Sequence, residues 1–166
     1  HTSLMRIATK SSKLNISKLE NTKKIADIFA KNIFKGNVIL FYGEIGVGKT
    51  TFIKFLVNSL EKIDKKNISE ITSPTFSLMN QYKLNKFDIH HYDLYRLKSE
   101  KDILSLNIFE DISDKIVLIE WPEILGEHKP KNTIDINFEY GENFNSRYLT
   151  ISAYEKLKIF DEFKSL

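Results

Sequence analysis

The chain has 166 residues and a formal net charge of +3; 42% of its residues are hydrophobic and 28% are charged. These values predict one globular domain with a substantial core and argue against a low-complexity or disordered chain. The lack of cysteine excludes a disulfide-linked partner, thiolate metal sites and thiol catalysis.

No apolar run approaches the length of a membrane span, and no signal-peptide pattern is present. We therefore expect a cytoplasmic protein with no membrane partner. Residues 1–4, which precede Met5, are expected to be a cloning remnant, and residues 5–166 a single domain. The lysines are scattered, which favours an ordinary solvated surface over a dedicated binding face for an acidic partner such as RNA.

The first predicted elements are a short strand around residues 5–8 and a helix after it. Ser17-Lys18-Leu19-Glu20 matches a capping box, the pattern that opens many helices. Apolar residues then recur every four positions, at Ile25, Phe29 and Ile33. Gly36 stands where this helix is expected to stop.

The next segment contains a complete G-x-x-x-x-G-K-[ST] motif between a predicted strand and a predicted helix. The strand covers Asn37 to Tyr42, a β-branched and aromatic run, and the helix covers Thr51 to Leu60. This order is the setting in which the motif forms a phosphate-binding loop, or P-loop. The motif residues are Gly43, Glu44, Ile45, Gly46, Val47, Gly48, Lys49 and Thr50.

The chemistry of a P-loop follows from these residue types. Glycines adopt backbone conformations with positive φ and let the main chain approach a phosphate closely. Successive N–H groups and the start of the helix then surround the β-phosphate. Lys49 would reach the β- and γ-phosphates, and the Thr50 hydroxyl would bind Mg²⁺. The alternative, a plain glycine-rich turn before a helix, explains fewer of these features, so we expect a nucleoside triphosphate site.

The central part of the chain predicts a hairpin, a short helix and a buried strand. Two strand-like runs, 76–84 and 87–94, are joined by a turn at Asn85-Lys86. Ser99 is expected to cap a short helix that ends near Leu106. Lys115 to Glu120 is almost entirely apolar until its last residue, which is typical of a central parallel strand.

The C-terminal part predicts a second hairpin and a last helix. Thr133 to Tyr140 alternates apolar and polar residues, and the pattern resumes at Arg147 to Ser152. A terminal helix is expected over residues 154–163. Together the elements predict an α/β, single-domain P-loop NTPase fold with a mostly parallel central sheet, antiparallel hairpins and helices on both faces.

A P-loop requires a carboxylate at the end of a neighbouring strand to organise Mg²⁺. Glu120 and Asp93 both end predicted strands, and Glu120 is the stronger candidate because its strand is more apolar. Trp121, the only tryptophan, follows Glu120 and either lies at the mouth of the site or covers the edge of the core. Ser73-Pro74-Thr75-Phe76 resembles a switch segment, although an ordinary turn explains its spacing nearly as well.

Two other patterns suggest sites that we do not expect. Asn85-Lys86-Phe87-Asp88 spells the guanine-recognition tetrad N-K-x-D, but it occupies a predicted hairpin turn and no D-x-x-G precedes it. His90 and His91 would point to opposite faces of a strand, so they cannot both bind one metal, and a core or surface role is favoured for both.

Taken together, the motifs resemble the TsaE family, small P-loop ATPases of tRNA threonylcarbamoyladenosine synthesis. The resemblance covers roughly residues 17–130, with weaker similarity at residues 147–151. Its blocks, in the family's order, are Gly43 to Thr51, Ser73 to Phe76, Tyr92-Asp93-Leu94-Tyr95-Arg96-Leu97 and Ile119-Glu120-Trp121-Pro122-Glu123. Many NTPases share the first block, whereas the other three together are highly specific.

The resemblance implies roles for individual residues. It assigns Lys49, Thr50 and Thr51 to an ATP and Mg²⁺ site, Thr75 to a switch-like segment and Asp93 to a Walker-B-like acid. It makes Glu120 an Mg²⁺-associated glutamate and Trp121 a residue needed for activity. Thr22 matches a threonine near the nucleotide in the family's first helix. Lys49, Asp93 and Glu120 are thus the expected catalytic residues, and Thr50 and Glu120 the expected metal ligands.

The resemblance also implies how the activity is used. The chain would bind the TsaB–TsaD pair, meet tRNA indirectly through that complex and hydrolyse ATP slowly until the partners stimulate it. Two alternatives stay open. One is a P-loop small-molecule kinase, although Arg6, Arg96 and Arg147 are the only arginines from which a multi-arginine lid could be built. The other is a nucleotide-gated binding module whose hydrolysis is incidental.

Overall fold

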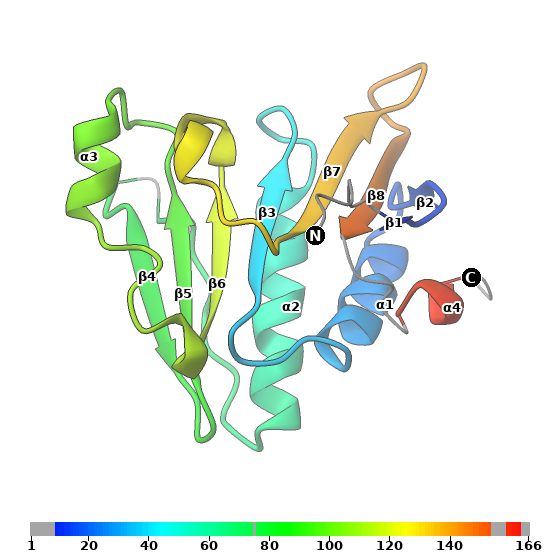
Figure 1. The fold of residues 1–166 in the computed structure, drawn as a ribbon. Coiled ribbons are helices and arrows are strands. Elements are labelled where there is room, and N and C mark those ends of the chain that lie inside the picture. The colour runs from blue at the N-terminus through cyan, green and yellow to red at the C-terminus, as the bar shows by residue number, and fades with distance from the viewer. Residues whose placement is uncertain (1–8, 75, 154–158, 164–166) are drawn as a thin grey trace, which may run out of the picture.

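One mixed sheet organises the chain in the computed structural model, which describes residues 9–74, 76–153 and 159–163 (Figure 1). Its strands are β1 (Thr9–Lys10), β2 (Leu14–Asn15), β3 (Val38–Tyr42), β4 (Met79–Lys83), β5 (Asp88–Asp93), β6 (Lys115–Glu120), β7 (Ile134–Tyr140) and β8 (Arg147–Ala153). The α-helices are α1 (Leu19–Ala30), α2 (Lys49–Ile63), α3 (Glu100–Ser105) and α4 (Ile159–Phe163). Two 3₁₀ segments are η1 (Ile112–Asp114) and η2 (Pro122–His128).

The strand order places the phosphate-loop strand at the centre of the sheet. The order is β1-β8-β7-β3-β6-β5-β4, and β2 also pairs with β8. The four central strands β7, β3, β6 and β5 run parallel to one another, while β4 pairs antiparallel with β5 and β8 pairs antiparallel with β7. The predicted fold class is confirmed: the parallel strands form the centre, and the antiparallel pairs lie on either side.

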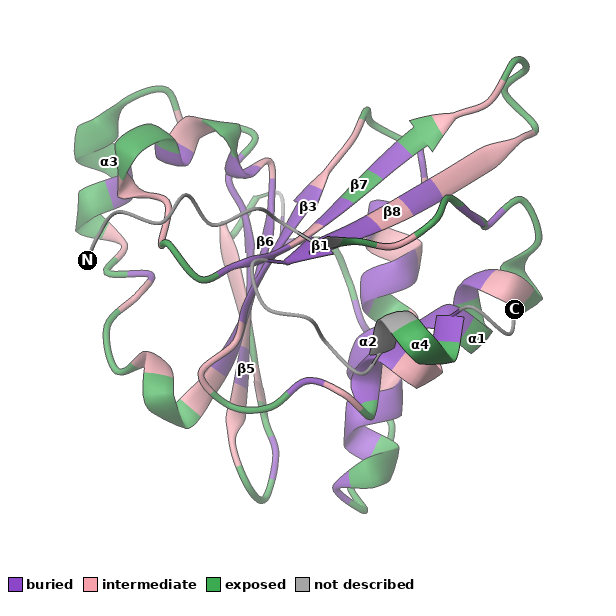
Figure 2. Cartoon of the chain, turned by 45° about the vertical axis from the view of Figure 1, so that its right-hand side comes forward, coloured by how far each residue is buried: buried purple, intermediate pink, exposed green. Residues whose placement is uncertain are grey.

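Helices cover both faces of this sheet, and alternate residues of each central strand point to the two faces. On one face, Phe29 of α1 and Phe52 of α2 belong to the same buried cluster as Ile39 and Phe41 of β3. On the other face, α3, η1 and η2 cover a smaller cluster that includes Leu40. Figure 2 shows the result for β3 and β6, which are buried along almost their whole length. Burial on both faces explains why β3 and β6 are continuous apolar runs.

The local predictions for the two hairpins and the short helix are confirmed. β4 and β5 pair antiparallel across the turn at Asn85-Lys86. β7 and β8 also pair antiparallel, with Ile134 opposite Ala153 and Tyr140 opposite Arg147. The Ser99 hydroxyl oxygen accepts a hydrogen bond from the Asp102 N–H and so caps α3.

The prediction for the first helix was wrong at both ends. Lys18, not Ser17, is the N-cap of α1, and no side chain caps this end. The Ser17 hydroxyl is used elsewhere, because it accepts a hydrogen bond from the Arg147 N–H at the start of β8. The helix also ends at Ala30, well before Gly36, whose N–H donates to the Lys115 carbonyl in the turn that leads into β3.

Two predictions at the ends of the chain fall partly outside the described residues. The strand expected at residues 5–8 lies outside them, and pairing begins with β1 against β8. Of the terminal helix expected over 154–163, the structure describes only α4. No helix in the described part of the chain combines the length and the apolar character needed to cross a bilayer.

Candidate functional site

The phosphate-binding loop lies between β3 and α2, where the central parallel strands end. Ligands of open α/β sheets bind at this edge. Gly43 begins the loop with a φ of +144°, and a Cβ atom there would lie 2.9 Å from both the Cβ and the carbonyl oxygen of Phe138 on β7. Only glycine lets the loop pass this close to the neighbouring strand.

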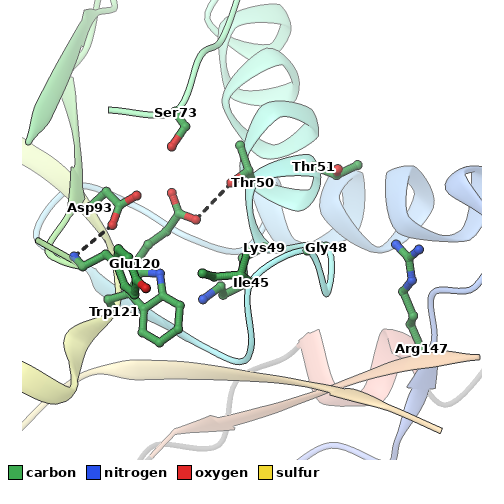
Figure 3. Close-up of a pocket in the computed structure, with 12 residues that line it drawn as sticks. Ile45, Gly48, Lys49, Thr50, Thr51, Ser73, Asp93, Glu120, Trp121 and Arg147 are labelled. Carbon is green, nitrogen blue, oxygen red and sulfur yellow. Dashed lines mark hydrogen bonds between the residues drawn. The ribbon is translucent and has the colours of Figure 1, made fainter. Parts of the chain in front are cut away.

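A pocket of about 360 Å³ opens above the loop. It extends from the ends of β5 and β6 on one side to the start of β8 on the other (Figure 3). Its lining residues are Ile45, Gly46, Gly48, Lys49, Thr50, Thr51, Ser73, Asp93, Tyr95, Glu120, Trp121 and Arg147.

Lys49, the first residue of α2, is buried at the base of this pocket. Its ammonium donates a hydrogen bond to the Gly43 carbonyl oxygen and lies 3.8 Å from the centre of the Trp121 ring. Burial lowers the pKa of Lys49, and the nearby carboxylates of Glu120 and other acids partly oppose this shift. A partly desolvated ammonium among backbone N–H groups is suited to bind an anion.

Glu120 connects the end of β6 to the start of α2. One carboxylate oxygen, Oε1, accepts a hydrogen bond from the Thr50 hydroxyl at 3.1 Å. The other, Oε2, lies 2.8 Å from Nε2 of His91 on β5. Both Glu120 and His91 are buried, so a carboxylate is held at the inner end of the pocket by partners from two other elements.

Asp93 is the second acid, and the sheet register sets it beside Glu120. Asp93 and Glu120 are paired residues at the carboxyl ends of the parallel strands β5 and β6. One Asp93 oxygen accepts a hydrogen bond from the Tyr95 N–H at 3.0 Å. In Figure 3 the side chains of Asp93, Glu120, Thr50 and Ser73 point toward the same space.

Trp121 forms one wall of the pocket and is half-buried. Its backbone is left-handed, with φ of 58° and ψ of 53°, an uncommon conformation for a bulky residue. The ring packs against the ring of Tyr95, which follows β5, at a centroid distance of 4.8 Å and an interplanar angle of 48°. The chain therefore turns sharply after Glu120, and the indole lies between Tyr95 and Lys49 at the mouth of the site.

The donor set at the inner end of the pocket fits Mg²⁺ bound together with phosphates. Mg²⁺ prefers oxygen ligands and is usually held by one or two protein groups plus phosphate oxygens and water. Thr50 and Glu120 offer a hydroxyl and a carboxylate oxygen only 3.1 Å apart. Within the described ranges, no three His, Cys, Asp or Glu side chains gather into a metal site of their own.

Most of the residues predicted for the site line the pocket, but several do not. Val47 belongs to the buried core under the loop, so it could contribute only through its backbone, and neither Gly43 nor Glu44 is among the lining residues. Thr22 is buried in α1, where its hydroxyl donates to the Ile16 and Lys18 carbonyls. Thr22 does not line the pocket. Thr75 lies outside the described residues.

The structure also adds residues that the sequence analysis did not assign to the site. Ser73, Tyr95 and Arg147 line the pocket, and His91 lies directly behind Glu120. Ser73 and Tyr95 belong to the sequence blocks of the family resemblance, and Arg147 begins its weaker part at residues 147–151, but nothing in the spacing showed which of these residues face the cavity. His91 and His90 do point to opposite faces, as predicted, but the expectation of a core or surface role for both missed the contact of His91 with Glu120.

The fold and the loop place the chain in the class of P-loop NTPase-like proteins. A crystal structure of YdiB from Bacillus subtilis matches it with a TM-score of 0.72 and 23% sequence identity, covering 96% of each chain. The similarity at this identity concerns the fold alone.

The family model described as threonylcarbamoyl adenosine biosynthesis protein TsaE matches residues 16–149, and the chain belongs to this TsaE family. The tRNA threonylcarbamoyladenosine biosynthesis protein TsaE of Rickettsia conorii is 36% identical over 137 residues, which cover 82% of this chain and 75% of that protein. The protein of the same description from a Nostoc species is 34% identical over 148 residues, covering 86% of each.

Proposed function

We propose that this chain is the ATP-binding and ATP-hydrolysing component of the machinery that makes threonylcarbamoyladenosine in tRNA. Family membership supports the pathway, because the relatives carry this biosynthesis in their names. The observation that carries the ATPase assignment is the Thr50–Glu120 hydrogen bond, which joins the phosphate-binding loop to a buried carboxylate inside one pocket.

Each polar group of the pocket has a role in this proposal. The N–H groups at the start of α2 and the Lys49 ammonium hold the phosphates. Thr50 and Glu120 hold Mg²⁺, which when bound neutralises charge on the phosphate oxygens. Asp93, beside Glu120, orients or polarises the attacking water or supports the metal. The preference for adenine rests on the family resemblance alone.

We propose further that hydrolysis is slow in the isolated chain and is stimulated by the TsaB–TsaD pair. Phosphoryl transfer depends on a complete, water-excluding set of positive groups. Among the residues that line the pocket, Lys49 and Arg147 are the only cationic side chains, and Tyr95 at its mouth is exposed. A bound partner would cover this mouth and complete the site. The complex would form in the cytoplasm, and tRNA would be met through TsaB–TsaD.

The experiment that tests the proposal is steady-state phosphate release from ATP by the purified chain, alone and with its cognate TsaB–TsaD pair. We expect a low rate alone and strong stimulation by the pair. A rate of phosphate release that the pair does not change would contradict the assignment to this machinery. Transfer of phosphate to an acceptor instead of water would indicate a kinase.

The non-hydrolysing alternative requires a second readout. A hydrolysis-deficient variant that still supports tRNA modification by the complete machinery would indicate a nucleotide-gated binding module. Loss of modification together with loss of hydrolysis supports the ATPase proposal.

A further inference from the structure

His91 is buried behind the inner end of the pocket. Its ring nitrogens contact one pocket residue, Glu120. The residue has no measurable exposure, and its Nε2 lies 2.8 Å from Glu120 Oε2. We propose that His91 is a positioning residue that fixes the orientation of the Glu120 carboxylate for metal binding. This inference rests on the nucleotide site proposed above.

The sheet register explains why the two side chains meet. His91 on β5 is paired with Leu118 on β6, and Glu120 is two residues beyond Leu118. Residues two apart on a strand share a face, so His91 and Glu120 are diagonal neighbours on one face of the sheet. Leu118 belongs to the core cluster that contains the α2 residues. The contact therefore lies beneath the first turn of α2.

The hydrogen-bonding chemistry selects one arrangement of the imidazole. An ionised carboxylate only accepts hydrogen bonds, so the hydrogen in this contact belongs to Nε2 of His91. The other ring nitrogen, Nδ1, is buried and has no hydrogen-bond partner among the described residues. A hydrogen on Nδ1 would be a buried donor without an acceptor, whereas a free lone pair costs less. Both nitrogens thus favour the tautomer with its hydrogen on Nε2.

The two oxygens of Glu120 have different kinds of partner. Oε1 accepts from Thr50, whose hydroxyl is the expected ligand of Mg²⁺ in a P-loop. If Thr50 bound a metal, it would do so through a lone pair of its hydroxyl oxygen and could still donate its hydrogen to Oε1. The His91 imidazole is buried within the sheet and would hold Oε2 whether or not a metal is bound. Outer partners of this kind commonly change metal affinity or activity by about 10- to 100-fold.

Two substitutions separate positioning from simple core packing. His91→Gln keeps an N–H donor at the same number of bonds from the backbone as Nε2, while His91→Leu fills the space without a donor. The control is His90→Gln, because His90 is the neighbouring histidine on the opposite face of β5 and lies near Tyr92.

The closing experiment measures Mg²⁺ binding directly as well as turnover. With ADP present, Mg²⁺ is titrated while the fluorescence of Trp121, the only tryptophan, is recorded. We expect His91→Leu to raise the Mg²⁺ concentration at half-saturation by about 10-fold or more, with His91→Gln close to wild type and His90→Gln unchanged. ATP turnover should show the same shift in Mg²⁺ dependence.

Different outcomes overturn different claims. If His91→Leu matches wild type, or if His91→Gln fails as badly as His91→Leu while both remain folded by circular dichroism, His91 does not position Glu120. If wild type binds no nucleotide, the proposed function fails and this inference fails with it.

A second test needs no nucleotide. A long-range ¹H–¹⁵N NMR spectrum shows which ring nitrogens of each histidine carry a hydrogen, and the signals of His91 are identified as those that disappear in His91→Gln. A His91 ring with its hydrogen on Nδ1 and none on Nε2 would overturn the arrangement whatever the function.

Discussion

At the scale of single residues, Lys49 connects the phosphate-binding loop to Trp121 at the mouth of the pocket. Its ammonium bonds to the Gly43 carbonyl of its own loop and lies against the Trp121 ring. A phosphate group would supply negative charge, so binding of phosphate would stabilise the buried ammonium.

This argument predicts the behaviour of Lys49→Ala. We expect ATP hydrolysis to fall by roughly 100-fold or more, because the ammonium that faces the phosphates is lost. Thermal stability without nucleotide should be unchanged or slightly higher, because burying a cation opposes folding. Phosphate release and thermal unfolding measure the two effects.

A matched control for this variant is Lys54→Ala, which removes an exposed lysine from the same helix. We expect it to retain wild-type turnover. Hydrolysis that survives in Lys49→Ala would remove Lys49 from the site.

At the scale of elements, the phosphate-binding loop depends on its contact with β7. The first loop residue, Gly43, touches the backbone of Phe138, and Val47 anchors the loop in the core below. The loop conformation is therefore determined by packing against a strand that follows it by about a hundred residues in the chain. The glycine motif permits this conformation, and the neighbouring strand selects it.

Comparing two glycine variants tests this account. Gly43→Ala should lower the free energy of unfolding by roughly 2–5 kcal/mol, because it adds overlap with Phe138 to a strained positive φ. Gly36 has a φ of +98°, but no atom lies within 4 Å of a Cβ added there. Gly36→Ala should therefore lower the free energy of unfolding by only about 1–2 kcal/mol. Urea denaturation gives both values. Equal losses would show that the close approach to Phe138 contributes nothing.

At the scale of the whole molecule, the sheet brings three distant segments into one pocket. Thr50, Asp93 and Glu120 come from α2, β5 and β6, and each lies where its element begins or ends. The central strands that carry the two acids are buried on both faces, so the positions of these side chains are set by the core. A ligand that touches all three would connect the elements that build the fold.

Nucleotide binding should therefore stabilise the entire domain. With Mg²⁺ and ADP at about 100 times the dissociation constant, the free energy of unfolding should rise by about 2.7 kcal/mol. For a chain of this size the melting temperature should rise by roughly 5–10 °C. Scanning calorimetry measures the shift, and removing Mg²⁺ with EDTA should reduce it. A melting temperature that does not change when Mg²⁺ and ADP are added would contradict the proposed site.

Local chemistry in the sequence was sufficient to predict most of the fold and the inner part of the pocket. The P-loop motif, the apolar runs of β3 and β6 and the turn at Asn85-Lys86 each act over a few neighbouring residues, so their patterns can be recognised without a structure. Glu120 was identifiable for a related reason, since a carboxylate that ends an apolar strand is conspicuous, and Asp93 was identifiable as the acid that ends the second strand of the first hairpin.

Tertiary structure decided the rest, because the remaining choices depend on partners far away in the chain. Ser17 binds the backbone of Arg147 instead of capping its own helix, and Thr22 turns toward Ile16 instead of the pocket. His91 meets Glu120 only through the register of two parallel strands. The sequence by itself determined which chemical groups this protein possesses and which elements carry them. Packing between distant elements decided which of these groups face one another.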